Sequence, residues 1–170
     1  MPVYFNDLKV IFEKEHESIE IPKYATEGSS GMDIRAYLPK DKEYYLFGAV
    51  KYIKDDGEIE IHIHPGGRAL IPSGIKVDIP KGFEIQVRPR SGIALKHGIT
   101  ISNAPGTIDW DYRGDIGVIL QNSSNQIFKV SNGDRIAQLV VAPVTILNVI
   151  EGTISETERG QSGFGSTGIR

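Results

Sequence analysis

The sequence contains no cysteine, which excludes disulfides and thiolate metal sites. It also lacks an apolar run of the length that a membrane span needs, and its first residues, MPVYFNDLKVIFEKEHE, carry too many charges for a signal peptide. No stretch keeps the i, i+3, i+4, i+7 apolar spacing of a long helix. We therefore expect a cytoplasmic protein with few helices and no membrane partner.

The chain also lacks a basic excess. Its 19 Lys and Arg residues are outnumbered by 22 Asp and Glu residues, for a net charge of −3, so no overall positive field indicates a nucleic-acid partner. Its 170 residues with 39% hydrophobic and 24% charged composition are typical of one soluble globular domain with an ordinary core.

The sequence is instead rich in glycine and proline, which break it into short segments. Nineteen glycines and nine prolines separate short apolar runs, and in EIEIHIH three isoleucines alternate with polar residues as in a half-buried strand. The spacing predicts an antiparallel all-β sandwich or barrel, with one short helix over 91–97. The expected strands are 8–12, 58–64, 68–79, 83–88, 98–102, 115–120, 126–130 and 135–144, and the expected turns are 65–67, 72–74, 80–82, 122–125 and 131–134.

Two histidines, His62 and His64, fall on one face of a predicted strand. They could begin a metal site, but zinc needs three or four ligands and no further His or Cys stands at a recognisable spacing. A polar strand face is the preferred interpretation.

Three stretches carry residues suited to chemistry. Asp109 directly follows an apolar run, and residues 109–115 are expected to interrupt a hairpin; its carboxylate could accept a proton from water or could cap a turn. Arg90, Ser91 and Gly92 stand at the junction of a strand and a helical turn, which suits an oxyanion but equally suits a helix cap with surface charges. Gln138 lies in an apolar strand and needs a hydrogen-bond partner if it is buried.

The C-terminal stretch RGQSGFGSTGIR contains the spacing G-x-G-x-x-G of dinucleotide-binding turns. Such a turn precedes a helix, and only two residues follow here, so that interpretation is excluded. A mobile chain end remains one explanation.

Five stretches, in order, resemble the five motifs of the trimeric deoxyuridine triphosphatase (dUTPase) family, which splits dUTP into dUMP and pyrophosphate. They are SGMDIRAY (30–37), PRSGIALKHG (89–98), NAPGTIDWDYRGDI (103–116), GDRIAQLV (133–140) and RGQSGFGSTG (159–168). The resemblance implies a jelly-roll-like β domain over residues 1–154, a flexible C-terminal arm over 155–170, and a homotrimer whose active sites are shared between chains. Residues 43–57 resemble an insertion, for which we expect a hairpin that extends the sheet.

The resemblance also implies roles for individual residues. Asp109 is expected to deprotonate the water that attacks the α-phosphorus, and the Tyr112 ring to lie under the deoxyribose and exclude a 2′-hydroxyl. Asp33 is expected near Arg90, and Mg²⁺ is expected to be held by the triphosphate and water without a direct protein ligand. The uracil contacts are expected from Asn103, Thr107, Ile108 and Gly117, and the phosphate contacts from Arg90, Ser91, Gly92 and Gln138.

In the arm, the resemblance implies that Phe164 stacks on uracil while Arg159, Ser166 and Thr167 reach the phosphates, beside Gly165. Two residues depart from the family pattern. Ser162 replaces a glycine of the fifth motif, and the bulky Trp110 stands between two acids, either outside the pocket or against a neighbouring chain.

The expected role of such an enzyme is to limit uracil in DNA and to supply dUMP for thymidylate synthesis. One alternative is a dCTP deaminase of the same fold, but the strand that would hold its catalytic glutamate reads DIGVILQN and contains none. The other is a nucleotide-binding module without activity, which the complete set of motifs disfavours.

Overall fold

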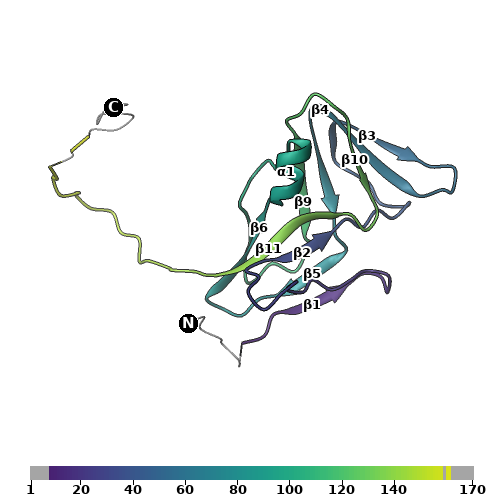
Figure 1. Cartoon of the computed structure of the whole chain (residues 1–170). Coiled ribbons are helices and arrows are strands. Elements are labelled where there is room, and N and C mark those ends of the chain that lie inside the picture. The colour runs from purple at the N-terminus through teal and green to yellow at the C-terminus, as the bar shows by residue number, and fades with distance from the viewer. Residues whose placement is uncertain (1–7, 159, 162–170) are drawn as a thin grey trace.

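The computed structural model of the chain describes residues 8–158, 160 and 161, and in this part strands dominate (Figure 1). All strand pairs in it are antiparallel, so the predicted all-β architecture with one short helix is confirmed. The elements are β1 (Ile11–Lys14), β2 (Met32–Arg35), β3 (Leu46–Ile53), β4 (Ile59–Pro72), β5 (Ile75–Asp78), β6 (Phe83–Arg88), α1 (Ser91–His97), β7 (Ile99–Ile101), β8 (Gly106–Ile108), β9 (Gly117–Asn122), β10 (Phe128–Ser131) and β11 (Arg135–Pro143).

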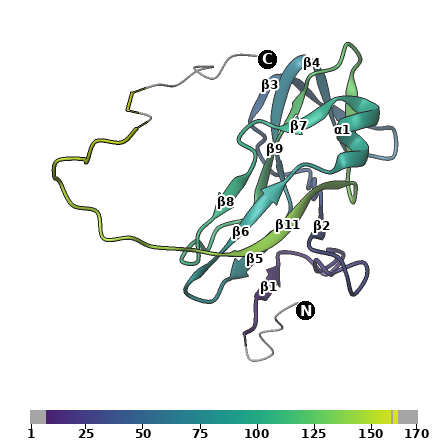
Figure 2. The same cartoon turned by 60° about the vertical axis from the view of Figure 1, so that its left-hand side comes forward.

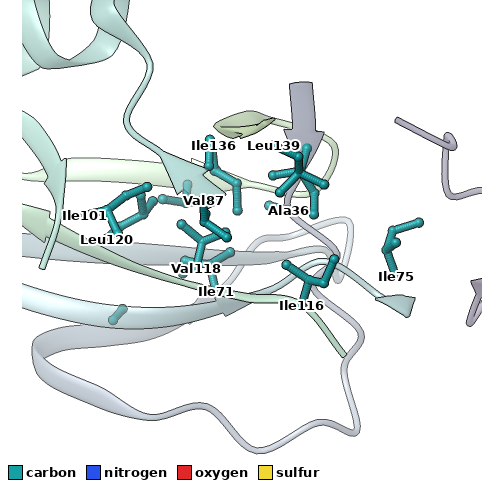
Figure 3. Packing of buried hydrophobic residues seen from close by; sticks show 14 of the residues in the cluster. Ala36, Ile71, Ile75, Val87, Ile101, Ile116, Val118, Leu120, Ile136 and Leu139 are labelled. Atoms are coloured by element: carbon teal, nitrogen blue, oxygen red, sulfur yellow. The ribbon is translucent and has the colours of Figure 1, made fainter. Parts of the chain in front are cut away.

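Two sheets make the body of the domain. One has the strand order β2-β11-β6-β8, and the other has the order β10-β4-β9-β7 with β3 added on β4; β1 and β5 form a separate pair. Figure 3 shows side chains from both sheets meeting, with Ile71 and Val118 from one and Val87, Ile136 and Leu139 from the other. These five are at most 3% exposed, and burial of such aliphatic side chains is the main force that joins the two layers.

The alternation of apolar and polar residues correctly predicted several of these strands and their buried faces. The three isoleucines of EIEIHIH, Ile59, Ile61 and Ile63, are all buried, while His64 on the opposite face is exposed. The strand over 83–88 and the helix over 91–97 have the predicted bounds. Strands 32–35 and 106–108 were not predicted, because three or four residues are too few to show a period.

The turn predicted at Pro65-Gly66-Gly67 is wrong, because β4 runs through these residues as one strand of 14 residues. Opposite them, β3 shifts register between Phe47 and Ala49, so that Gly48 alone faces residues 64–67. This is a β-bulge. A Cβ on Gly67 would collide with the Gly48 carbonyl, so glycine lets the two backbones meet here where the sequence pattern indicated a chain reversal.

The segment over 43–57 contains β3, which pairs with β4 along its length. The expected hairpin that extends the sheet is therefore confirmed, and Figure 1 shows it projecting from the body beside β10. Tyr44 anchors its start by donating a 2.6 Å hydrogen bond to the Pro39 carbonyl. Burial of the phenol raises the pKa of Tyr44 to about 12.

Beyond β11 the described chain leaves the body as an extended segment that contains no strand or helix up to residue 157 (Figures 1 and 2). It is rich in exposed apolar side chains: Ile146 is 80% exposed, Val149 92% and Ile154 92%. Of the expected arm, Arg159 and residues 162–170 lie outside the described residues. No described helix has the length and hydropathy to cross a membrane.

Candidate active site

A cavity of about 290 Å³ opens where β8 ends and β9 begins, between the two sheets. Small-molecule sites are usually concave pockets of roughly 300 Å³ or more, so this one suits a single small ring system and its substituent. Apolar side chains such as Leu70 and Val87 form part of its wall. Six of the predicted substrate contacts line it, namely Asn103, Thr107, Ile108, Asp109, Tyr112 and Gly117.

The hairpin expected around residues 109–115 is absent. β8 pairs with β6 in one sheet, whereas β9 pairs with β4 and β7 in the other, so the turn crosses between layers instead of reversing within one. Close packing fixes β8 on β6, since a Cβ on Gly106 would lie 3.3 Å from Val87 Cβ. The crossing turn thus spans the edge of the sandwich and supplies one lip of the cavity.

Asp109 stands on that lip, directly after the last residue of β8. The residue is exposed, and its carboxylate forms no hydrogen bond or ion pair with any other described residue. Tyr112 beside it is 43% exposed and donates from its hydroxyl to the Asp115 carbonyl at 3.0 Å. A carboxylate that is free of protein partners can accept a proton from a bound water.

The far end of the turn is anchored through Asp115. Its Oδ1 accepts from the Ile75 backbone N–H at 3.1 Å and from the Ser73 hydroxyl at 3.2 Å, and its Oδ2 pairs with Lys42 Nζ at 3.0 Å. Burial opposes the charge of Lys42, but its contacts with Asp115 and Glu15 outweigh that cost and raise the pKa of the ammonium group. Asp115 therefore fixes the position of the turn. The sequence alone did not predict this role.

A second polar cluster centres on Asp33 of β2. Its Oδ1 accepts from Arg90 Nε at 3.0 Å, and its Oδ2 accepts from Arg135 Nη1 at 3.2 Å. Gln138 Nε2 lies 3.5 Å from the same carboxylate, and Arg90 also donates to the Arg135 carbonyl. The expected proximity of Asp33 and Arg90 is confirmed. One carboxylate thus holds two guanidinium groups and an amide at one place, a set of donors suited to phosphate.

Ser91 and Gly92 extend this cluster, because they open α1 directly after Arg90 and both are exposed. The interpretation of Ser91 as a helix cap is wrong. Arg90 occupies the cap position, without a side-chain capping bond, and Ser91 is the first helical residue. The Ser91 hydroxyl is therefore not used to satisfy the helix start.

Within one chain, Asp109 and the Asp33 cluster lie toward opposite ends of β6. Ile108 pairs with Ile85 near the start of β6, which places Asp109 beside the level of Glu84, while Arg90 follows the other end, next to α1 (Figure 2). Six residues of extended chain separate these levels, or about 20 Å. None of Asp33, Arg90, Ser91 and Gln138 lines the cavity. A single chain does not bring the two groups together.

The two histidines are not combined into a metal site. His62 forms a 2.6 Å contact with Glu60 and stacks on Tyr52 at 5.2 Å between ring centroids. The hydrogen bond to His62 lowers the pKa of Glu60, against the effect of burial and with help from the Ser131 hydroxyl. Among the described residues, no group of three or more His, Cys, Asp or Glu side chains is placed to hold a metal ion.

Comparison with known sequences assigns the chain to a family. The sequence model of the dUTPase family matches residues 58–168. Deoxyuridine 5'-triphosphate nucleotidohydrolases from Roseobacter denitrificans and Beijerinckia indica are 48% and 49% identical over 89% of this chain and 88% and 85% of their own. The chain belongs to the dUTPase family. The protein of that name from Treponema denticola is 46% identical over 94% of this chain and 98% of its own length.

Solved dUTPases share the fold at lower identity. The dUTPase of Staphylococcus bacteriophage 80alpha, solved with dUpNHpp, has a TM-score of 0.69 and 23% identity over 95% of this chain and 99% of its own. A mutant dUTPase from phage phi11 of S. aureus has a TM-score of 0.66 and 19% identity over 88% of this chain and 99% of its own. The jelly-roll-like β fold expected from the motifs is thereby confirmed.

Trp110, the departure inside the third motif, is not among the residues that line the cavity. It is 40% exposed, and Lys81 Nζ lies 5.9 Å from its ring centroid. Trp110 therefore lies outside the pocket, and a contact with a neighbouring chain stays a prediction. The side chain packs toward the turn between β5 and β6.

Proposed function

We propose that this dUTPase-family chain hydrolyses dUTP to dUMP and pyrophosphate by attack of water on the α-phosphorus. The observation that carries the proposal is the exposed carboxylate of Asp109, free of partners among the described residues, on the lip of a nucleoside-sized cavity. Related proteins carry the name deoxyuridine 5'-triphosphate nucleotidohydrolase, and the 80alpha dUTPase binds dUpNHpp. Such an activity limits uracil in DNA and supplies dUMP, and the cytoplasm remains its expected location.

In this proposal the cavity holds the nucleoside. Asn103 and the backbone of Thr107, Ile108 and Gly117 read the uracil edge, and Tyr112 packs under the deoxyribose. Steric exclusion is needed to reject UTP, because an apolar pocket alone discriminates poorly against an added hydroxyl. The Tyr112 ring is suited to that task, since the bond from its hydroxyl to the Asp115 carbonyl fixes its outer end.

The phosphates then belong to Arg90, Ser91, Gly92 and Gln138, with Asp33 holding Arg90 in place. Phosphoryl-type substitution depends mainly on positioning and on neutralising charge. A Mg²⁺ ion would supply part of that neutralisation. Because Asp33 already pairs with two arginines, the donor set fits an ion carried by the triphosphate and water rather than one bound directly by side chains.

We further propose that the complete site forms in a homotrimer. The roughly 20 Å between the Asp109 and Arg90 ends of β6 supports a site in which one chain supplies the cavity and another the phosphate cluster. The exposed apolar residues of the extended segment after β11, Ile146, Leu147, Val149 and Ile150 among them, support association as well, because contiguous exposed apolar surface marks interaction sites.

The direct test incubates the chain with dUTP, UTP and dCTP in water labelled with the heavy oxygen isotope. We expect pyrophosphate and dUMP from dUTP, with the label in dUMP, and turnover of UTP slower by about 10²-fold or more. Label in pyrophosphate would place the attack at the β-phosphorus instead. Ammonia released from dCTP would replace the proposal with a deaminase, and binding of dUTP without any product would leave a nucleotide-binding module.

The expected arm is tested by ending the chain after Glu158. We expect the thermal midpoint and the oligomeric state to be unchanged and turnover of dUTP to fall by about 10²-fold, because the loss of substrate-positioning contacts has effects of this size. The lost contacts would be those of Arg159, Phe164, Ser166 and Thr167. A chain that lacks only Ile169 and Arg170 is the matched control. Unchanged turnover in the shorter chain would assign the segment no part in the reaction.

A further inference from the structure

The turn that carries Asp109 and Tyr112 has few bonds of its own. The Tyr112 N–H donates to the Asp109 carbonyl at 3.1 Å, and the Asp109 carboxylate bonds to no other described residue. The turn also crosses between sheets, so no ladder partner aligns it. Besides the Tyr112 hydroxyl bond to Asp115 and the anchoring of Asp115 on Ile75, a further bond would fix the direction in which Asp109 points.

Arg113 supplies that bond. Its Nη1 donates to two carbonyls of the same turn, those of Trp110 at 2.8 Å and of Tyr112 at 2.9 Å. Its Nη2 donates to Asp78 Oδ1 at 2.6 Å. The planar guanidinium can make these bonds together because its donors form a rigid fork, which a lysine lacks.

Asp78 fixes the position of the Arg113 guanidinium, because it belongs to a paired strand. It is the last residue of β5 and pairs with Ile11 across the β1–β5 ladder. Lys81, just beyond that strand, lies over the Trp110 ring at 5.9 Å. The turn is thus held at Trp110 and Arg113 by contacts with Asp78 and Lys81, and neither Trp110 nor Arg113 lines the cavity that Asp109 and Tyr112 line.

We propose that Arg113, oriented by Asp78, is a positioning residue that holds the 109–113 turn so that Asp109 and Tyr112 face the bound nucleotide. This inference rests on the proposed hydrolysis of dUTP. Gly114 belongs to the same arrangement, because a Cβ there would collide with the Tyr112 ring. The next residue, Asp115, is anchored on Ile75, so the turn is fixed at both ends.

Exposure separates this role from a role in stability. The Arg113 and Asp78 side chains are 53% and 55% exposed, and exposed ion pairs add little to the stability of a fold. Small displacements of a reacting group, in contrast, reduce rates strongly. Loss of Arg113 should therefore appear in kcat and not in the thermal midpoint.

The test compares Arg113→Ala, Arg113→Lys, Asp78→Ala and the double variant Asp78→Ala/Arg113→Ala with the wild type, by dUTP turnover and thermal unfolding. We expect kcat about tenfold lower in both Arg113 variants with a smaller change in KM, an unchanged thermal midpoint, and a double variant no slower than Arg113→Ala, because the two residues act as one unit. Lys76→Ala is the matched control, since Lys76 also lies on β5 and forms an exposed ion pair, with Glu13 at 3.8 Å.

A second readout does not depend on the reaction. Arg113→Ala should speed hydrogen exchange at the Tyr112 amide, which donates within the turn, whereas Lys76→Ala should not. Wild-type kcat together with wild-type exchange in Arg113→Ala would overturn the proposal while leaving dUTP hydrolysis established. Additive losses in the double variant, or losses matched by a lower thermal midpoint, would also overturn it. If the wild-type chain leaves dUTP intact while Arg113→Ala still speeds exchange at the Tyr112 amide, the proposed function and the catalytic part of this inference are overturned. Only the role of Arg113 in holding the turn then stands.

Discussion

Asp109→Asn is expected to lower the rate of dUTP hydrolysis on the order of 10³-fold, the scale of general-base catalysis, while nucleotide binding remains measurable. The substitution keeps the shape of the side chain and removes its ability to take a proton from water. Because this carboxylate forms no bond with any other described residue, its loss should leave the turn and the fold intact. The effect should therefore fall on kcat.

The measurement is pyrophosphate release at saturating dUTP, with binding of a non-hydrolysable dUTP analogue and the thermal midpoint measured in parallel. Asp111→Asn is the matched control, since Asp111 is an exposed acid two residues away that does not line the cavity. Equal losses in both variants would indicate a general effect of charge near the phosphates. Full activity of Asp109→Asn would remove Asp109 from the role of base.

Local features of this site could be predicted from the sequence, and features that depend on tertiary structure could not. Alternation identified the buried isoleucines of β4, and the junction of a strand and a helix was correctly placed at Arg90 and Ser91. The position of Asp109 at the end of an apolar run was also correct. These features depend on neighbours in sequence, which a pattern records.

The failures have a common physical cause, which is that pairing partners are distant in sequence. Pro65-Gly66-Gly67 carries a turn signal, but contact between Gly67 and Gly48 converts it into a bulge. The apolar runs around Asp109 indicated a hairpin, but packing of Gly106 on Val87 assigns them to different sheets. The anchoring of Asp115 by Lys42 bridges 73 residues, so no local signal could reveal it.

The second prediction with a large expected effect is that two inactive variants recover activity when mixed, because the site is divided between chains. Asp109→Asn and Arg90→Ala should each be nearly inactive alone, because each variant lacks one essential group in every site. If Asp109 and Arg90 of a working site come from different chains, mixed trimers regain sites in which both groups are intact. Random assembly of an equal mixture then restores about a quarter of the wild-type sites. If both groups came from one chain, no intact site could form.

A second mixture, of wild type and a double variant, checks the expected fraction of intact sites independently. Wild type assembled with an equal amount of the double variant Asp109→Asn/Arg90→Ala has about a quarter of its sites intact if the site is shared, and about half if each chain builds its own. Size-exclusion chromatography of each mixture controls for assembly. A mixture that remains monomeric would contradict the trimer directly.

The measurement that tests the account most directly is therefore dUTP turnover by the co-refolded mixture of Asp109→Asn and Arg90→Ala chains. The roughly 20 Å between the two ends of β6 predicts recovery to about a quarter of wild-type turnover, from two chains that are each nearly inactive. Turnover no higher than the sum of the separate variants, together with half-activity in the matched mixture, would show that each chain builds a complete site by itself and would contradict the account.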